Sequence, residues 1–486
     1  MGLQFSFQPL LSILLLLLVT ATCVSATYPP MSMRFHRTKS VTKTDSLVDL
    51  PPDFVAYNYT QTLDHFNYNP ESYATFQQKY VLNFKYWGGP NTSSPIFVYT
   101  GAEDPITFQI TGFIVELASR FNGLLLYIEH RYYGDSMPFG SEDEAFKNAS
   151  TFGYLSSTQA LADYAQLITD VKKNLSAENC PVIAVGGSYG GMLSSWLRLK
   201  YPHIVTGALA SSAPILYFDD ITPQNGYHVV VTNDFREYSE SCYNTIKQSW
   251  NEIDRVGAVA NGLQDLSRIF STCSPLDSTQ KLKDHISLVY VISAQYDNPP
   301  ENWVSKVCSA IDGTPQGTDI LGRVAAGLNA SFLGGGGRPC NYISDFKLNN
   351  KSAWDWQTCT EMVMPIGHGG NDTMFEAWPF DLNNLTRTCQ AVFGVTPRPH
   401  WITTEFGGHV SFFFKHLHCV LQDISDTVVA VYTNEGAHGL DLSSSSPSDP
   451  DWLVAQRDKE IKIIQFWIAE YNARLSTTKI GNKVGS

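Results

Sequence analysis

The chain of 486 residues carries a formal charge of −13, from 33 basic and 46 acidic side chains. This acidic balance argues against non-specific binding to nucleic acid, because phosphates attract basic surfaces. The length predicts either one large core with an insertion or two domains.

The N-terminal residues predict the compartment. Leu10–Val19 is an apolar run, and Val24-Ser25-Ala26 follows it as a small-residue cleavage site. The run is too short to span a bilayer, so residues 1–26 are predicted to be a signal peptide. No later segment is apolar enough to cross a membrane. We therefore expect a soluble mature chain in the secretory pathway, either extracellular or in a vacuole or lysosome.

Cysteine and asparagine patterns agree with an oxidising lumen. Nine cysteines include Cys23 in the signal peptide, and the other eight are compatible with disulfides. None forms a Cys-x-x-Cys pair, so no metal site or cofactor is expected. Asn-x-Ser/Thr sequons predict a glycoprotein. They begin at Asn58, Asn91, Asn148, Asn174, Asn329, Asn350, Asn371 and Asn384.

The predicted elements change character along the chain. Strands are predicted at 80–86, 95–100, 124–130, 181–185 and 206–210, with helical patterns between several of them, such as 158–174. Such alternation favours a mostly parallel sheet covered by helices.

The pattern then becomes helix-like and loop-like over 216–399, a stretch that holds six of the eight mature cysteines. A strand at 427–432 and an amphipathic helix at 451–475 follow. The sequence thus predicts an α/β sheet domain in two parts, 27–215 and 400–486. A helical, disulfide-stapled insertion over 216–399 interrupts it.

A candidate nucleophile lies at the end of the fourth predicted strand. Ser188 is the centre of the run Gly186-Gly187-Ser188-Tyr189-Gly190, which precedes a predicted helix over 191–200. A strand–turn–helix of this kind holds a serine hydroxyl exposed, and the flanking glycines permit the sharp turn. The alternative is a glycine-rich turn with an incidental serine, but the context favours the nucleophile.

The candidate base is His438, which lies just after the predicted strand at 427–432. In α/β-hydrolase sheets the order along the chain is serine, acid, histidine, with the histidine on a loop after the last strand. His130 precedes the serine and His409 precedes the last strand, so both fit this order less well. A surface or structural role is the alternative for each histidine.

Several longer runs resemble the family of lysosomal prolyl (Pro-X) carboxypeptidases and dipeptidyl peptidase II. The resemblance extends from Tyr57 to Leu475. It rests on Gln61-Thr-Leu-Asp-His-Phe-Asn67, Tyr99-Thr-Gly-Ala-Glu-Asp104, Glu129-His-Arg-Tyr-Tyr-Gly134, Gly186-Gly-Ser-Tyr-Gly-Gly-Met192, Thr404-Glu-Phe-Gly-Gly-His409 and Glu435-Gly-Ala-His438. It implies an α/β-hydrolase fold with a helical cap inserted, and hydrolysis of peptide bonds at a proline near a chain end. Whether the chain is a carboxypeptidase or a dipeptidyl peptidase, and whether it forms a homodimer, stays open.

The resemblance also implies residue roles. The backbone N–H of Tyr189 and an N–H of the loop at Ala102 would form the oxyanion hole. Met192 and Met364 match positions that line an apolar proline pocket, although ordinary core packing explains both equally well. Glu103 would pair with a substrate amine in a dipeptidyl peptidase, or would brace its loop.

The family's cysteine pairing, carried over to this chain, implies three disulfides. They would join Cys242 to Cys308, Cys273 to Cys340, and Cys359 to Cys389. Cys180 would remain a buried free thiol.

The chain departs from the family where the catalytic acid is expected. Family members carry a run of the type Ser-Asn-Gly-x-x-Asp-Pro-Trp, whose Asp orients the catalytic histidine. Here no Asp-Pro-Trp exists, and no carboxylate lies between Glu405 and Asp423. The acid-bearing segment near 410–420 is therefore missing or replaced, with Asp423 as a weak stand-in.

The sequence accordingly supports two main interpretations. The first is a serine exopeptidase whose catalytic acid is lost. The second is an inactive relative that acts as a binding glycoprotein. A lipase-like esterase on the same fold is a third interpretation, which the family motifs disfavour.

Overall fold

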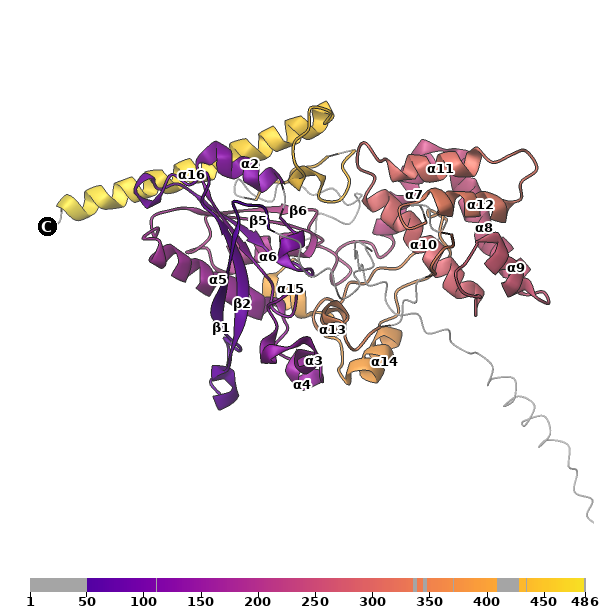
Figure 1. Cartoon of the computed structure of the whole chain (residues 1–486), viewed down its shortest axis with the longest axis horizontal. Coiled ribbons are helices and arrows are strands. Elements are labelled where there is room, and N and C mark those ends of the chain that lie inside the picture. Colours follow the sequence, from indigo (N-terminus) through magenta and orange to yellow (C-terminus); the bar gives the residue numbers. More distant parts are fainter. Residues whose placement is uncertain are drawn as a thin grey trace, which may run out of the picture.

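The computed structural model describes residues 50–484, apart from 111, 335–338, 344–347, 370, 409–427 and 434. The predicted signal peptide, His409 and Asp423 thus lie outside the described residues. Figure 1 shows two bodies side by side, a sheet with its covering helices and a bundle of helices.

The sheet has the strand order β1-β2-β4-β3-β5-β6 within the described ranges. Strands β1, β2 and β4 pair antiparallel, whereas β4, β3, β5 and β6 pair parallel. The bounds are β1 Val55–Thr62, β2 Thr75–Asn83, β3 Ile96–Thr100, β4 Leu124–Ile128, β5 Val182–Gly187 and β6 Gly207–Ser211. Strands β3 and β4 are buried at every residue, which explains their unbroken apolar runs. This architecture is the predicted α/β-hydrolase fold.

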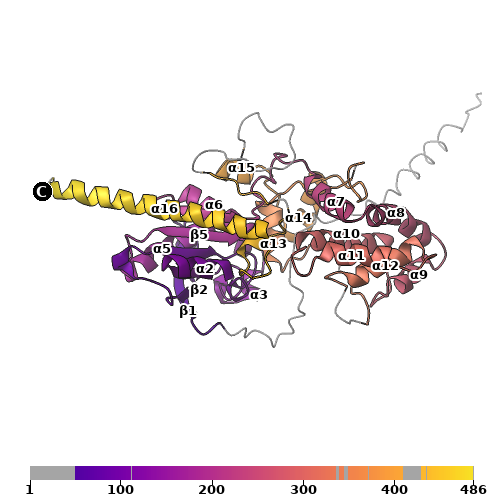
Figure 2. The ribbon, with the colours of Figure 1, turned by 90° about the horizontal axis from the view of Figure 1, so that it is seen from above.

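Helices cover both faces of the sheet. α5 (Ser157–Asn174) and α6 (Ser188–Lys200) pack on one face. α2 (Gly112–Phe121) and α16 (Asp451–Val484) pack on the other. Figure 2 shows α16 running along the sheet, with the C-terminus at the end remote from the helical bundle.

The insertion after β6 has an outer and an inner part. Its outer helices share a core of their own, which includes Phe235, Trp250 and Tyr290. They are α7 Gly226–Tyr238, α8 Glu240–Gly257, α9 Gly262–Ile269, α10 Thr279–Gln295, α11 Trp303–Asp312 and α12 Ile320–Ala330. The inner helices α13 (Ala353–Thr360) and α14 (Leu382–Phe393) pack instead against residues of the hydrolase body. The helical insertion is confirmed, whereas its limits at 216 and 399 stay a prediction.

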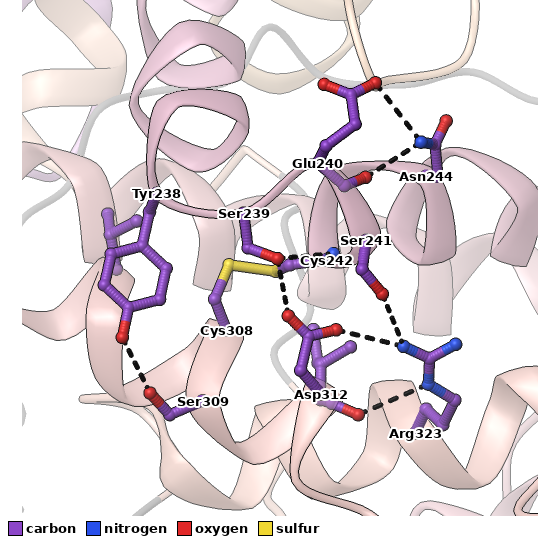
Figure 3. The surroundings of a disulfide bond; sticks show 12 residues. Tyr238, Ser239, Glu240, Ser241, Cys242, Asn244, Cys308, Ser309, Asp312 and Arg323 are labelled. Carbon is purple, nitrogen blue, oxygen red and sulfur yellow. Dashed lines mark hydrogen bonds and ion pairs between the residues drawn. A yellow bond between two sulfur atoms is a disulfide. The ribbon is translucent and has the colours of Figure 1, made fainter.

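Disulfides fasten the insertion at the pairs that the resemblance implies, Cys242–Cys308, Cys273–Cys340 and Cys359–Cys389. Figure 3 shows the first of them, which joins α8 to α11. Beside it, Ser239 Oγ accepts the Cys242 N–H at 3.1 Å and donates to Asp312 Oδ2 at 2.5 Å. Arg323 donates to the other Asp312 oxygen at 3.0 Å, so polar contacts support the same junction. Cys180 is buried and free.

Short elements complete the described chain. The short α-helices are α3 Glu142–Ala145, α4 Ala149–Phe152 and α15 Trp401–Phe406. The 3₁₀ turns are η1 Pro70–Tyr73, η2 Pro90–Thr92, η3 Ile106–Phe108, η4 Pro138–Gly140 and η5 Leu440–Leu442. None of the helices in the described ranges is long and apolar enough to cross a membrane.

One strand prediction was wrong, and one observed strand was not predicted. Residues 428–432 form no strand, and Val428 and Tyr432 are exposed. Their β-branched composition suits a pleated sheet, but a strand also needs a neighbour to complete its hydrogen bonds. Conversely, β1 was not predicted, because its run of mixed polar and aromatic residues is mostly exposed and contains no continuous apolar run.

Candidate active site

Ser188 lies at a sharp turn between β5 and α6. Its φ is +55°, a left-handed conformation that is unusual for a residue other than glycine. The turn needs small neighbours, because a Cβ on Gly186 would lie 2.3 Å from Gly190 O. A Cβ on Gly190 would lie 2.7 Å from Thr100 O. The glycines that flank Ser188 therefore let this tight turn form, and Ser188 itself remains partly exposed.

The loop after β3 lies beside this turn. Thr100 Oγ1 donates to Gly190 O at 2.7 Å, which ties the end of β3 to the first turn of α6. Gly101 N–H donates to Ile128 O at 3.0 Å, and its carbonyl accepts the Tyr164 hydroxyl at 2.8 Å. These contacts hold Ala102 close to the nucleophile turn, as expected for an oxyanion loop.

The Ala102 N–H already has an acceptor in the structure. It donates to Gln109 Oε1 at 2.9 Å. The other end of the same carboxamide, Gln109 Nε2, donates to Asp104 O at 2.5 Å. The predicted oxyanion donor is thus occupied by a side chain of the protein itself, a contact that the sequence did not reveal.

The side chain of Tyr189 is anchored on two sides, which fixes the residue whose N–H is the other predicted oxyanion donor. Gln357 Nε2 of α13 donates to the Tyr189 hydroxyl at 2.8 Å. His130 Nε2 lies 3.1 Å from the same hydroxyl, and His130 Nδ1 lies 2.6 Å from Arg131 O. Burial lowers the pKa of His130 to about 4, so its ring is neutral and acts here as a support for Tyr189.

His438 lies on a loop between the sheet and the helical insertion, which is called the cap from here on. The backbone N–H of His438 donates to Gln295 O at 2.9 Å, at the end of α10, and the His438 ring lies edge-on to Tyr296. The next residue, Gly439, donates its N–H to Ser212 Oγ at 2.9 Å, just beyond β6. The cap and the sheet therefore both position this histidine. Burial lowers the pKa of His438 to about 4, which favours the neutral, proton-accepting ring.

A buried polar cluster fixes the same loop to α16, and the sequence reading missed it. Asp441 Oδ1 accepts the Ser211 hydroxyl at 2.5 Å. Arg457 donates to Asp441 O at 3.0 Å and to Ser443 O at 2.8 Å. Glu460 is buried beside them, and burial with the nearby Asp441 charge raises its pKa to about 8. The one sequence cue was the spacing of Asp441 three residues after His438.

Ser188 and His438 line one cavity of about 400 Å³. Ala102 and Gln109 line it too, together with Tyr296 from the cap. Its walls carry two further acidic residues, Glu103 and Asp104. The cavity therefore brings together the predicted nucleophile, the predicted base and the predicted oxyanion loop, the three parts that acyl transfer requires.

The other predicted site residues lie elsewhere. Met192, a residue of α6, is fully buried in the core, and Met364 packs against the same core. Neither methionine lines the cavity, so their role in a proline pocket stays a prediction. Asp423 lies outside the described residues, and its role as a stand-in acid stays untested as well.

Comparison with known proteins agrees with this geometry. The sequence profile described as serine carboxypeptidase S28 matches residues 61–406. The human lysosomal Pro-X carboxypeptidase is 38% identical over 459 residues, which cover 88% of this chain and 91% of that protein. The bovine enzyme of the same name is 36% identical and covers 96% of this chain and 98% of its own. Prolyl carboxy peptidase like protein 5 of Caenorhabditis elegans is 30% identical, covering 81% of this chain and 86% of its own.

The profile match ends just before the segment that lacks the expected acid, and His438 lies beyond it. The match nevertheless spans most of the chain and includes the turn that carries Ser188. The chain belongs to the serine carboxypeptidase S28 family of serine peptidases.

Proposed function

We propose that this chain is a serine exopeptidase that cleaves peptide bonds at a proline near a chain end. We propose further that its turnover is slow because the catalytic acid of the family is lost. The observation that carries the proposal is the single cavity that joins Ser188, His438 and the oxyanion loop. The substrate follows from the similarity to relatives named Pro-X carboxypeptidases. Their lysosomal designation supports an acidic compartment of the secretory pathway for this chain.

The reaction proceeds in two halves. Ser188 Oγ attacks the carbonyl carbon while its proton passes to the His438 ring. The oxyanion accepts the Tyr189 N–H and an N–H of the 101–103 loop. His438 then gives its proton to the leaving amine as the peptide bond breaks. Water hydrolyses the resulting acyl-enzyme by the same route and restores Ser188.

The slow step has a physical cause. The burial that keeps His438 neutral also disfavours the imidazolium that forms when Ser188 attacks. In a complete triad a buried carboxylate offsets this cost and fixes the ring tautomer. The sequence offers no Asp-Pro-Trp segment to supply that carboxylate. The alternative function, a binding glycoprotein without turnover, rests on this same absence.

The test is hydrolysis by the purified, glycosylated chain at acidic pH. One substrate is benzyloxycarbonyl-Pro-Phe, which reports carboxypeptidase activity. The other is Lys-Pro-aminomethylcoumarin, which reports dipeptidyl peptidase activity and offers an amine to Glu103. We expect slow release from one of them, abolished in Ser188→Ala. A matched pair of substrates with alanine in place of proline should be hydrolysed more slowly.

Equal hydrolysis of the proline and alanine substrates would contradict the assignment to prolyl bonds. No release above the Ser188→Ala blank from either proline substrate would favour the binding glycoprotein.

A further inference from the structure

Gln109 spans the oxyanion loop with both ends of its carboxamide. The residue follows η3 and reaches back to the loop after β3. Its Oε1 accepts the Ala102 N–H at 2.9 Å, and its Nε2 donates to Asp104 O at 2.5 Å. Gln109 is partly exposed and lines the cavity that also contains Ser188.

This contact conflicts with the use of Ala102 as an oxyanion donor. A backbone N–H carries one hydrogen and makes one well-aligned hydrogen bond. While Gln109 Oε1 accepts it, a substrate oxygen cannot. The carboxamide oxygen and the substrate oxygen therefore compete for the same hydrogen.

We infer that Gln109 masks the second oxyanion donor in the free protein, and that the substrate carbonyl must displace it before Ser188 can react efficiently. The inference rests on the proposed acyl transfer at Ser188. It makes Gln109 a residue that controls the reaction through Ala102.

Charge and space allow the exchange. An anionic oxygen forms a stronger hydrogen bond than a neutral carboxamide oxygen, so the displacement becomes favourable as the oxyanion develops. Because Gln109 borders the cavity, its side chain has room to leave without moving the backbone. Gly101 is held separately by Ile128 and Tyr164, so the loop retains anchors when Gln109 departs.

Two substitutions of similar size separate masking from a purely structural role. Gln109→Met removes the acceptor and keeps the bulk of the side chain. Gln109→Glu keeps an acceptor for Ala102 and adds a negative charge that repels an oxyanion. Masking predicts opposite effects for the two variants. A role confined to bracing the loop predicts that both are impaired.

The first measurement does not need a working base. Binding of benzyloxycarbonyl-proline, whose carboxylate oxygen would enter the oxyanion hole, is followed by calorimetry in the Ser188→Ala chain. We expect Gln109→Met to tighten binding by about three- to tenfold, the worth of one net hydrogen bond. Gln109→Glu should weaken binding. Gln77→Met is the control, since the exposed Gln77 of β2 donates to Thr60 Oγ1 and does not line the cavity.

The second measurement needs no proline pocket. A fluorophosphonate labels Ser188 through an intermediate that uses the same hole, and Gln109→Met should label faster while Gln109→Glu labels more slowly. On any peptide substrate the gain should appear in kcat more than in KM.

Unchanged or weaker binding together with unchanged or slower labelling in Gln109→Met would overturn the inference. Faster labelling in Gln109→Met without turnover of any prolyl substrate would instead reject the proposed function alone.

Discussion

At the scale of single residues, Ser188 shows how the fold imposes a strained conformation. A left-handed backbone costs a residue with a Cβ about 1–2 kcal/mol. Here β5 on one side and α6 on the other fix φ at +55°. The turn places Ser188 on the wall of the cavity rather than in the core.

A pair of substitutions at this position should measure that strain. Both Ser188→Ala and Ser188→Gly remove the nucleophile, but only glycine adopts the left-handed conformation without a Cβ penalty. We expect Ser188→Gly to be more stable than Ser188→Ala by about 1 kcal/mol, reduced from the full penalty by the greater freedom of glycine in the unfolded chain. Thermal unfolding of the two proteins gives the difference. An alanine variant as stable as the glycine variant would show that the turn is relaxed.

At the scale of elements, the loop that carries His438 depends on α16. Arg457 is buried and donates to carbonyls at both ends of η5, and Glu460 lies one helical turn further along. Asp441 links this cluster to the end of β6. The C-terminal helix therefore supports the loop that carries His438, the predicted base, as well as covering the sheet.

Glu460 should make stability depend on pH. Its pKa is raised from 4.5 to about 8, first by burial and then by the Asp441 charge. Between these two values the folded chain retains a proton that the unfolded chain has released. Stability is therefore fully present below pH 4.5 and falls as the pH rises toward 8, by at most roughly 1.4 kcal/mol per pH unit.

The variant Glu460→Gln removes this dependence, because an amide does not titrate. Between about pH 5 and about pH 8 it should lose less stability than the parent in denaturant titrations. Glu470→Gln is the matched control on the same helix, where the carboxylate is exposed and pairs with Arg474. If the stability of the parent and that of Glu460→Gln change equally with pH, Glu460 does not retain its proton in the folded chain.

The Cys242–Cys308 bridge should stabilise the cap rather than the sheet. It closes a loop of 66 residues that lies within the outer helices. On the chain-entropy estimate, its loss from Cys242→Ala with Cys308→Ala costs about 4 kcal/mol. Calorimetry should then show the cap unfolding separately and first. The control is the variant in which both Cys359 and Cys389 are replaced by alanine. Their disulfide joins α13 to α14 and lies outside the outer helices. A single transition that shifts equally in both variants would refute this division.

At the scale of the whole molecule, the sequence predicted what local patterns determine. Strands β3 and β4 are apolar except for Thr100 at the end of β3, and the Gly-x-Ser-x-Gly turn needs its glycines for steric reasons. Both features could therefore be predicted directly from the sequence. The Gln109–Ala102 contact could not, because it depends on how the η3 turn folds a polar side chain back onto the preceding loop. The wrong strand at 428–432 shows the same limit, since β-propensity does not supply a pairing partner.

The missing acid segment is a feature of the whole sheet. Within the described residues β6 is the last strand on its side, and residues 409–427, where the acid-bearing run of the family is expected, lie outside them. We expect that inserting a run of the type Ser-Asn-Gly-x-x-Asp-Pro-Trp, with its strand, between His409 and Asp423 will raise turnover of a Pro-X peptide. The gain should approach about 10⁴, the cost of damaging the acid in a well-studied triad.

The control is the same insert with Asn in place of its Asp, because it restores the strand but not the charge. Turnover is compared at acidic pH, with Ser188→Ala as the blank. If the Asn insert matches the Asp insert, the strand alone positions His438, and the carboxylate is dispensable. If neither insert exceeds the parent, another carboxylate of this chain already orients His438, since a neutral buried ring with a pKa of about 4 would otherwise gain from a new charge beside it.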